Sequence, residues 1–136
     1  MSECCNGGNK SLLYACSGCS DVGACSDKTV RKLSKDGFGK MTCLAGVGAR
    51  ISGFVESAKG ADENITIDGC LVACARKTLE CIGVKPKSFI LTEMGLIKGK
   101  TAATEEVVKN MSNKIMAENK NTSSGNCAPG SDCCCG

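Results

Sequence analysis

The chain has 136 residues, which is enough for one domain with a single hydrophobic core. Its formal net charge of +3 comes from 17 basic and 14 acidic residues spread along the sequence, and its aromatic residues are one Tyr and three Phe. Nucleic-acid binding requires a basic stripe or stacking aromatic side chains, so the composition argues against a nucleic-acid partner. No apolar run approaches the length of a membrane span, so no membrane partner is expected.

Cysteine is the unusual component of the composition. The chain has 13 Cys and no His, so imidazole is missing both as a metal ligand and as a general base. The first residues, Met1 to Gly7, have neither the basic nor the apolar region of a signal peptide, and we therefore expect a cytoplasmic protein. In a reducing cytoplasm, clustered thiols indicate metal binding or redox chemistry rather than structural disulfides.

The N-terminal part begins with a polar stretch, residues 1–10, which we predict to be a flexible arm. Residues 12–15 have the composition of a short strand, and a loop rich in Ser, Gly and Asp follows at residues 16–23. An apolar edge on a charged segment predicts a helix from about Ala24 to Ser34.

A second strand is predicted at residues 41–44, and apolar residues at helical spacing predict one helix from Leu44 to Ala58. A third strand, residues 65–67, precedes the turn pair Asp68-Gly69. The helical spacing resumes at once, so Cys70 is expected at the start of a helix with Cys74 one turn further along the same face. The positive end of a helix favours thiolates.

The C-terminal part adds a fourth strand at residues 88–92 and a last helix from about Ala102 to Glu118. Residues 119–136 are rich in Asn, Ser, Gly and Cys, and we predict a disordered tail unless metal or disulfides hold it. The folded domain is therefore expected to span residues 11–118.

Strand and helix alternate four times, which predicts an α/β fold of three layers: a small four-stranded parallel sheet with helices on both faces. In such a fold, ligands bind at the carboxyl ends of the strands. Cys16, Cys43 and Cys70 each follow a predicted strand, and Cys74 comes shortly after the third. We therefore expect these four thiols to converge at one edge of the sheet.

Four motifs in this region resemble the DGC-domain family of proposed zinc-binding proteins, named after the tripeptide Asp68-Gly69-Cys70. The matching segments are residues 16–23, 39–48, 68–75 and 77–80. The resemblance covers roughly residues 12–98 and implies that Zn²⁺ is bound by Cys16, Cys43, Cys70 and Cys74. The family has no settled cellular role, so the resemblance implies a fold and a metal but no reaction. Cys19 stands where related sequences often carry another small residue.

Several interpretations of the thiols stay open. A closed set of four thiolates favours a structural, storage, sensing or delivery role, whereas three ligands leave a position for Lewis-acid chemistry. Cys16-x-x-Cys19 is alternatively the dithiol of a redox enzyme, and thiolates also suit other soft metals. Cys19 is equally well an additional ligand or a partly buried small residue. We expect a zinc-binding protein for metal handling or sensing, with enzyme activity, protein partner and oligomeric state undetermined.

Three further residues are assigned structural roles. Asp68 is predicted to cap the following helix by accepting backbone N–H groups, rather than to act in catalysis. Cys25 and Cys81 are predicted to be buried packing residues rather than ligands.

Overall fold

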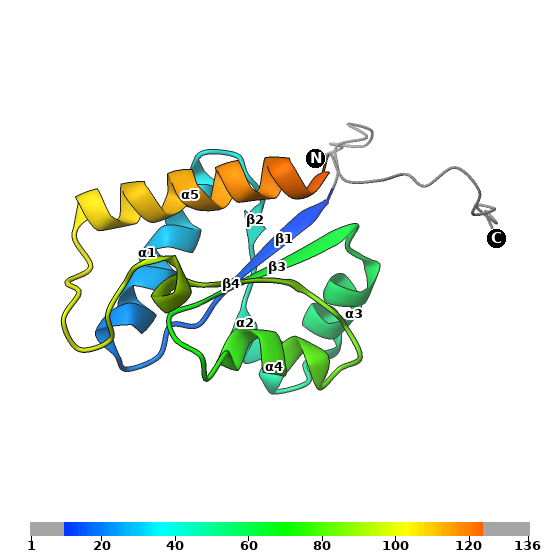
Figure 1. Cartoon of the computed structure of the whole chain (residues 1–136). Coiled ribbons are helices and arrows are strands. Elements are labelled where there is room, and N and C mark those ends of the chain that lie inside the picture. The colour runs from blue at the N-terminus through cyan, green and yellow to red at the C-terminus, as the bar shows by residue number, and fades with distance from the viewer. Residues whose placement is uncertain (1–9, 124–136) are drawn as a thin grey trace.

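Four parallel strands form the centre of the protein in the computed structural model, which describes residues 10–123 (Figure 1). The strands are β1 (Ser11–Ala15), β2 (Lys40–Met41), β3 (Glu63–Asp68) and β4 (Lys87–Ile90). The helices are α1 (Asp21–Lys35), α2 (Leu44–Gly48), α3 (Ser52–Gly60), α4 (Cys74–Glu80), the 3₁₀ turn η1 (Leu91–Met94) and α5 (Glu105–Ser123). The predicted arm and tail lie outside the described residues, except for residues 10 and 119–123.

The order of the strands in the sheet is β2-β1-β3-β4, and every pair is parallel. Leu13 of β1 lies opposite Met41 of β2 on one side and opposite Ile65 of β3 on the other. The predicted four-stranded parallel sheet is therefore confirmed. β2 is only two residues long, and the sheet edge it forms is correspondingly short.

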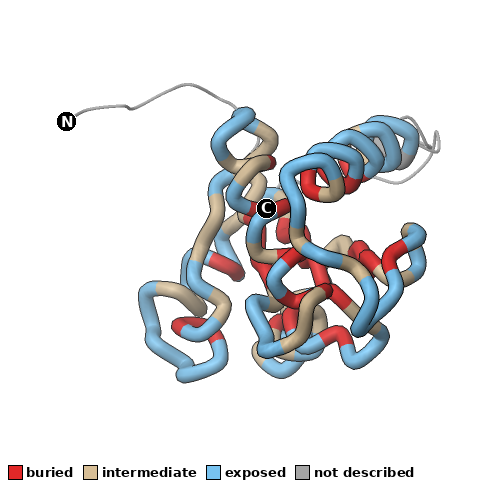
Figure 2. The backbone as a smooth tube through the Cα atoms, turned by 90° about the vertical axis from the view of Figure 1, so that its left-hand side faces the viewer, coloured by how far each residue is buried: buried red, intermediate tan, exposed pale blue. Residues whose placement is uncertain are grey.

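Helices cover both faces of the sheet, as the alternating side chains of β1 require. Leu13 and Ala15 belong to a core cluster that includes buried residues of α1 and α5. Tyr14 points to the other face and packs with residues of α2, α3 and α4, including Val47, Ala58 and Leu79. Figure 2 shows the buried residues gathered on the strands and on the inner sides of the helices. The three-layer α/β architecture is confirmed.

Several helices differ from the prediction, and α1 already begins at Asp21 rather than near Ala24. The expected single helix from Leu44 to Ala58 is two helices, α2 and α3, because Arg50 has a positive φ of 57° that a continuous helix does not accommodate. The last helix begins at Glu105 and continues to Ser123 rather than ending at Glu118. The last helix is therefore in error at its ends, whereas the other predicted helix is interrupted in its middle.

Candidate functional site

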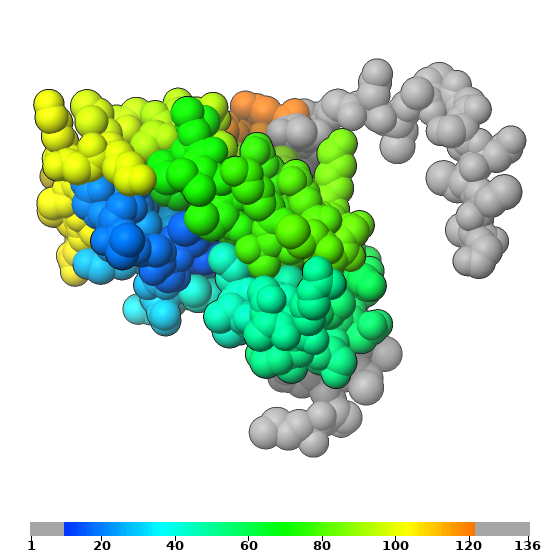
Figure 3. Space-filling view, turned by 90° about the horizontal axis from the view of Figure 1, so that it is seen from below, coloured from blue at the N-terminus to red at the C-terminus, as the bar shows by residue number. Residues whose placement is uncertain are grey.

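The carboxyl edge of the sheet is the place where its topology creates a crevice. The chain passes from β1 to β2 on one side and then returns across β1 to β3, so the connections leave β1 and β3 in opposite directions. Ligands in open parallel sheets bind at such a switch point. Cys16 directly follows β1, and the Asp68-Gly69-Cys70 turn follows the end of β3. In Figure 3 the blue segment after β1 adjoins both the green segment after β3 and the cyan segment around α2.

Cys16 and Cys74 are the two predicted ligands that the structure brings into contact. The Cys16 backbone N–H still donates to the carbonyl of Ile67 at 3.1 Å, so the strand register continues to this residue. Its side chain therefore shares the face of Tyr14, which is the face that α4 covers. Cys74 is the first residue of α4, and its thiol lies close enough to that of Cys16 to raise the pKa of the latter. Two segments nearly sixty residues apart in sequence thus place sulfur atoms together.

The environment of Cys16 favours its protonated form. Burial raises the pKa of the Cys16 thiol, and the neighbouring Cys74 and Asp68 raise it further, against a lowering by the backbone N–H of Gly18. Like charges close together and a desolvated position both penalise the thiolate. A thiol in such a position becomes a thiolate readily only when a cation compensates the charge.

The chain between Cys70 and Cys74 is not helical, which corrects the prediction that Cys70 begins the helix. The carbonyl of Cys70 accepts the N–H of Ala73 at 3.0 Å in a turn, and Ala73 has a left-handed φ of 53°. The helix starts only after this residue. Cys74, rather than Cys70, therefore occupies the first turn of α4, and the two thiols do not share a helical face.

Asp68 caps α4, as predicted, although it lies outside the turn that begins the helix. Its two carboxylate oxygens accept the N–H groups of Ala75 at 2.8 Å and Arg76 at 3.2 Å. The side chain is fully buried, and burial raises the pKa of the Asp68 carboxyl above its ordinary value. Asp68 thus fixes the start of α4, and with it Cys74, to the end of β3.

Gly69 lets the end of β3 pass close to α1. A Cβ atom at this position would lie 2.5 Å from the backbone carbonyl carbon and oxygen of Val22, and 2.8 Å from the nitrogen of Gly23. No side chain fits there without movement of the helix. The Asp-Gly-Cys tripeptide therefore combines a helix cap, a close backbone contact and a thiol in three successive residues.

Cys70 and Cys43 lie at the same edge but have other neighbours. Cys70 packs against the core cluster on the α1 and α5 side of the sheet, and the Lys98 ammonium lies 3.7 Å from its sulfur. The Cys43 sulfur accepts the N–H of Gly46 at 3.3 Å and so caps α2. Both thiols are at least partly accessible.

The remaining cysteines are distributed as follows. Cys19 is exposed in the loop before α1, where it is a free thiol and not a buried small residue. Cys25 is fully buried in the core, as predicted. Cys81 is exposed, and the prediction that it packs in the core is wrong because it lies at the C-terminal end of α4, beyond the buried Leu79. Cys4, Cys5 and the cysteines at positions 127 and 133–135 lie outside the described residues.

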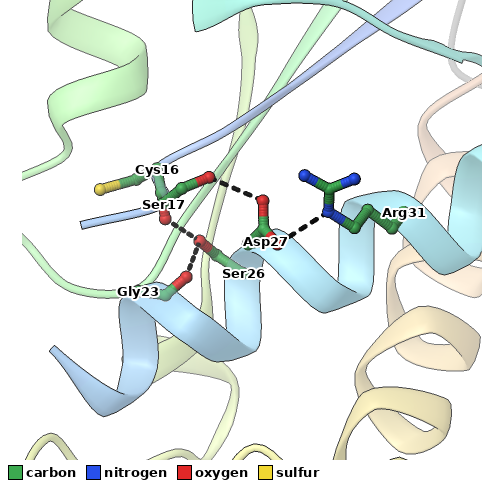
Figure 4. Close-up of polar contacts among 6 residues, drawn as sticks. All are labelled: Cys16, Ser17, Gly23, Ser26, Asp27 and Arg31. Atoms are coloured by element: carbon green, nitrogen blue, oxygen red, sulfur yellow. Dashed lines mark hydrogen bonds and ion pairs between the residues drawn. The ribbon is translucent and has the colours of Figure 1, made fainter. Parts of the chain in front are cut away.

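A polar chain that the sequence analysis did not single out runs along the other side of the segment after Cys16 (Figure 4). Ser17 donates to Asp27 at 2.8 Å, and the Arg31 guanidinium donates to the second oxygen of Asp27, also at 2.8 Å. The Ser26 hydroxyl contacts the carbonyl oxygens of Cys16 and Gly23. The spacing of Asp27 and Arg31, four residues apart on a helix, was the available signal.

Zinc suits the chemistry of these donors, although the described residues do not yet form a complete ligand group. Thiolates are ordinary zinc ligands, and Cys16 and Cys74 already lie together. Within residues 10–123, however, no three His, Cys, Asp or Glu side chains are grouped so that they could hold a metal ion. The four-cysteine ligand set therefore stays a prediction.

The comparisons with known proteins show the family to which the chain belongs. The DGC domain family matches residues 12–116, which contain the whole sheet except its first residue, and the chain belongs to this family. The chain is similar to the anaerobic and virulence modulator AnvM of Pseudomonas aeruginosa, with 34% identity over 88 residues that cover 64% of this chain and 67% of the relative. No solved structure matches the chain. None of the helices between residues 10 and 123 combines the length and apolar character that a bilayer crossing requires.

Proposed function

We propose that the protein is a metal-handling or metal-sensing regulator that holds Zn²⁺ through thiolates at the carboxyl edge of its sheet. The observation that carries this proposal is the proximity of the Cys16 and Cys74 thiols at the switch point, where the ends of β1 and β3 meet. The description of the similar protein as a modulator supports a regulatory rather than a metabolic role.

Cys16 and Cys74 supply the first two ligands, and Cys70 and Cys43 supply the other two from the ends of β3 and β2. The cation compensates the charge of the deprotonated thiols, and so offsets the burial and the like-charge repulsion that raise the pKa of Cys16. A complete set of four thiolates leaves no position for water, so the site serves storage, transfer or sensing rather than hydrolysis.

The accessibility of the donors supports reversible binding. Cys43 and Cys74 are exposed, and Cys16 and Cys70 are partly exposed. Because Cys70 packs on the opposite side of the sheet from Cys74, binding requires its side chain to turn away from Lys98. Occupancy of the metal is thereby coupled to the loop between Cys70 and Ala73, which gives a regulator a conformational output.

The test is the zinc content of the purified full chain and of two cysteine variants. We expect one zinc per chain in the native protein and a loss of most of it in Cys74→Ser, which removes one of the two thiols in contact. Cys81→Ser is the matched control, because Cys81 is an exposed thiol at the other end of the same helix. Native zinc content in Cys74→Ser, or a metal-free native chain, contradicts the proposal.

A thiol redox function is the second candidate, and the same contact favours it. Two adjacent thiols can reduce a disulfide substrate: their two protons and two electrons pass to the substrate, and a Cys16–Cys74 disulfide forms. The pair Cys16 and Cys74 is preferred here over Cys16-x-x-Cys19, because Cys74 and not Cys19 is among the groups that shift the pKa of Cys16. The test is whether the metal-free chain reduces a small disulfide, and whether the Cys16 and Cys74 thiols disappear together as it does so. Such a reaction distinguishes the redox function from metal binding.

A further inference from the structure

A groove of about 920 Å³ lies beside the thiol pair, on the other side of the segment that follows β1. Its walls come from α1, from β2 and from the α2–α3 segment, and they include Cys43 but neither Cys16, Cys70 nor Cys74. The volume is in the range of pockets that take small organic molecules. The groove is thus a separate feature that adjoins the proposed metal site through Cys43 alone.

One wall of the groove is cationic. Arg31 and Lys40 line it, against the single carboxylate of Asp27, so one positive charge is left uncompensated. Both oxygens of Asp27 are already occupied, one by the Ser17 hydroxyl and the other by the Nε–H of Arg31.

These contacts orient the guanidinium without using its terminal nitrogens. In Figure 4 the dashed line to Asp27 ends on Nε of Arg31, and no dashed line ends on the two terminal nitrogens. The Lys40 ammonium, on the edge strand, forms no ion pair with any carboxylate of residues 10–123. A guanidinium held in this way and a free ammonium are suited to bind an oxyanion.

The opposite wall is apolar. Phe54 and Ile51 line it together with Leu44, and Ile51 remains 51% exposed although it is a large apolar residue. The Phe54 ring packs closely on the backbone of α2 at Gly46. A Cβ atom added to Gly46 would lie only 2.4 Å from this ring. A fixed aromatic surface that water contacts gains free energy when a ligand covers it.

From these two walls we infer that the groove binds a small organic acid: an oxyanion held by Arg31 and Lys40, with an apolar body that covers Phe54 and Ile51. Neither a purely ionic ligand nor a neutral apolar one satisfies both walls. Because Cys43 lines the groove and is also a proposed metal ligand, such an acid would bind at the same edge of the sheet as the proposed metal. The inference itself rests on the groove residues and holds whether or not zinc binds.

The test uses anilinonaphthalene sulfonate, an aromatic anion whose fluorescence rises when it leaves water, with the folded full chain. We expect saturable binding that octanoate displaces and octanol, its neutral counterpart, does not. Lys40→Met should weaken the affinity by about fivefold, since a partly exposed charged hydrogen bond is lost. Lys120→Met removes a positive charge from the exposed C-terminal end of α5, which does not line the groove, and should leave the affinity unchanged.

Equal displacement by octanol and octanoate, or equal affinities of the native chain and Lys40→Met, overturns the inference. The location is checked independently by alkylation of the metal-free protein. Bound octanoate should slow the reaction of Cys43 and leave that of Cys81, which is exposed and outside this groove, unchanged. Unaltered alkylation of Cys43 at saturating octanoate also overturns the inference. Failure of the zinc experiment affects neither measurement.

Discussion

Replacement of Gly69 by Ala tests whether the tripeptide after β3 is required by packing. The added Cβ would meet the Val22 carbonyl at 2.5 Å, well inside the closest approach that real Cβ atoms make. Because the obstacle is the backbone of α1, no side-chain rotation relieves it. Gly69 has no positive φ, so the penalty measured is steric rather than torsional.

Overpacking of a rigid interior costs about 1–3 kcal/mol, and contact with backbone atoms rather than a movable side chain argues for the upper end of that range. For a chain of this length, that corresponds to a fall in melting temperature of roughly 10 °C. Urea denaturation followed by circular dichroism gives the free energy of unfolding directly.

Gly53→Ala is the matched control for this experiment. Gly53 lies in α3, and a Cβ there would meet nothing within 4 Å. Ala is preferred over Gly in a helix, so this variant should be stabilised by about 0.5–1 kcal/mol. If Gly69→Ala loses less than ~0.5 kcal/mol relative to the native chain, the close packing of β3 on α1 is not what requires glycine.

Three predictions concern titratable groups. Burial raises the pKa of Asp68, so above about pH 4 the native state binds more protons than the unfolded chain. The free energy of unfolding should therefore fall as pH rises through the folded pKa. Asp68→Asn should lack that fall when denaturation is measured across the same pH range. Burial opposes ionisation of Asp27, but hydrogen bonds from Arg31 and Ser17 outweigh it and lower the pKa of its carboxyl. Asp27→Asn should therefore lower the free energy of unfolding by about 0.5 kcal/mol at neutral pH, and leave it unchanged once acid has protonated the native carboxylate. An equal loss of stability at both pH values refutes the assignment. Burial raises the pKa of Tyr14, the single tyrosine, to about 12. The phenolate absorbance of the folded chain should therefore stay low until the pH is well above the ordinary tyrosine pKa of about 10. A titration midpoint at that ordinary value contradicts the burial of Tyr14.

The fold was predictable because its signals are periodic. Short apolar strands alternate with longer segments at helical spacing, and that alternation alone specifies a parallel sheet covered on both faces. What escaped prediction depends on single backbone conformations. The positive φ of Arg50 divides one apolar stripe into two helices, and the left-handed Ala73 delays the start of α4. Neither residue type favours that conformation, so the sequence carries no local sign of it.

The position of the candidate site was predictable only in part. Placing a cysteine after each of three strands was sufficient to locate Cys16, Cys43 and Cys70 at one edge of the sheet. The particular contact of Cys16 with Cys74 follows from alternation along β1, which continues through Cys16. The position of Cys70 on the other side of the sheet does not follow, because the Gly69 turn ends that alternation.

The two-residue length of β2 has a consequence for the behaviour of the protein at high concentration. An outermost strand with unpaired amide and carbonyl groups is a template on which another chain can add, and long flat ones promote aggregation. Here one margin of the sheet offers only Lys40 and Met41, and the other, β4, begins with a lysine and is cut short by a 3₁₀ turn. Neither margin offers a long apolar template, so this chain can expose its reactive sulfur atoms without also inviting strand exchange between molecules.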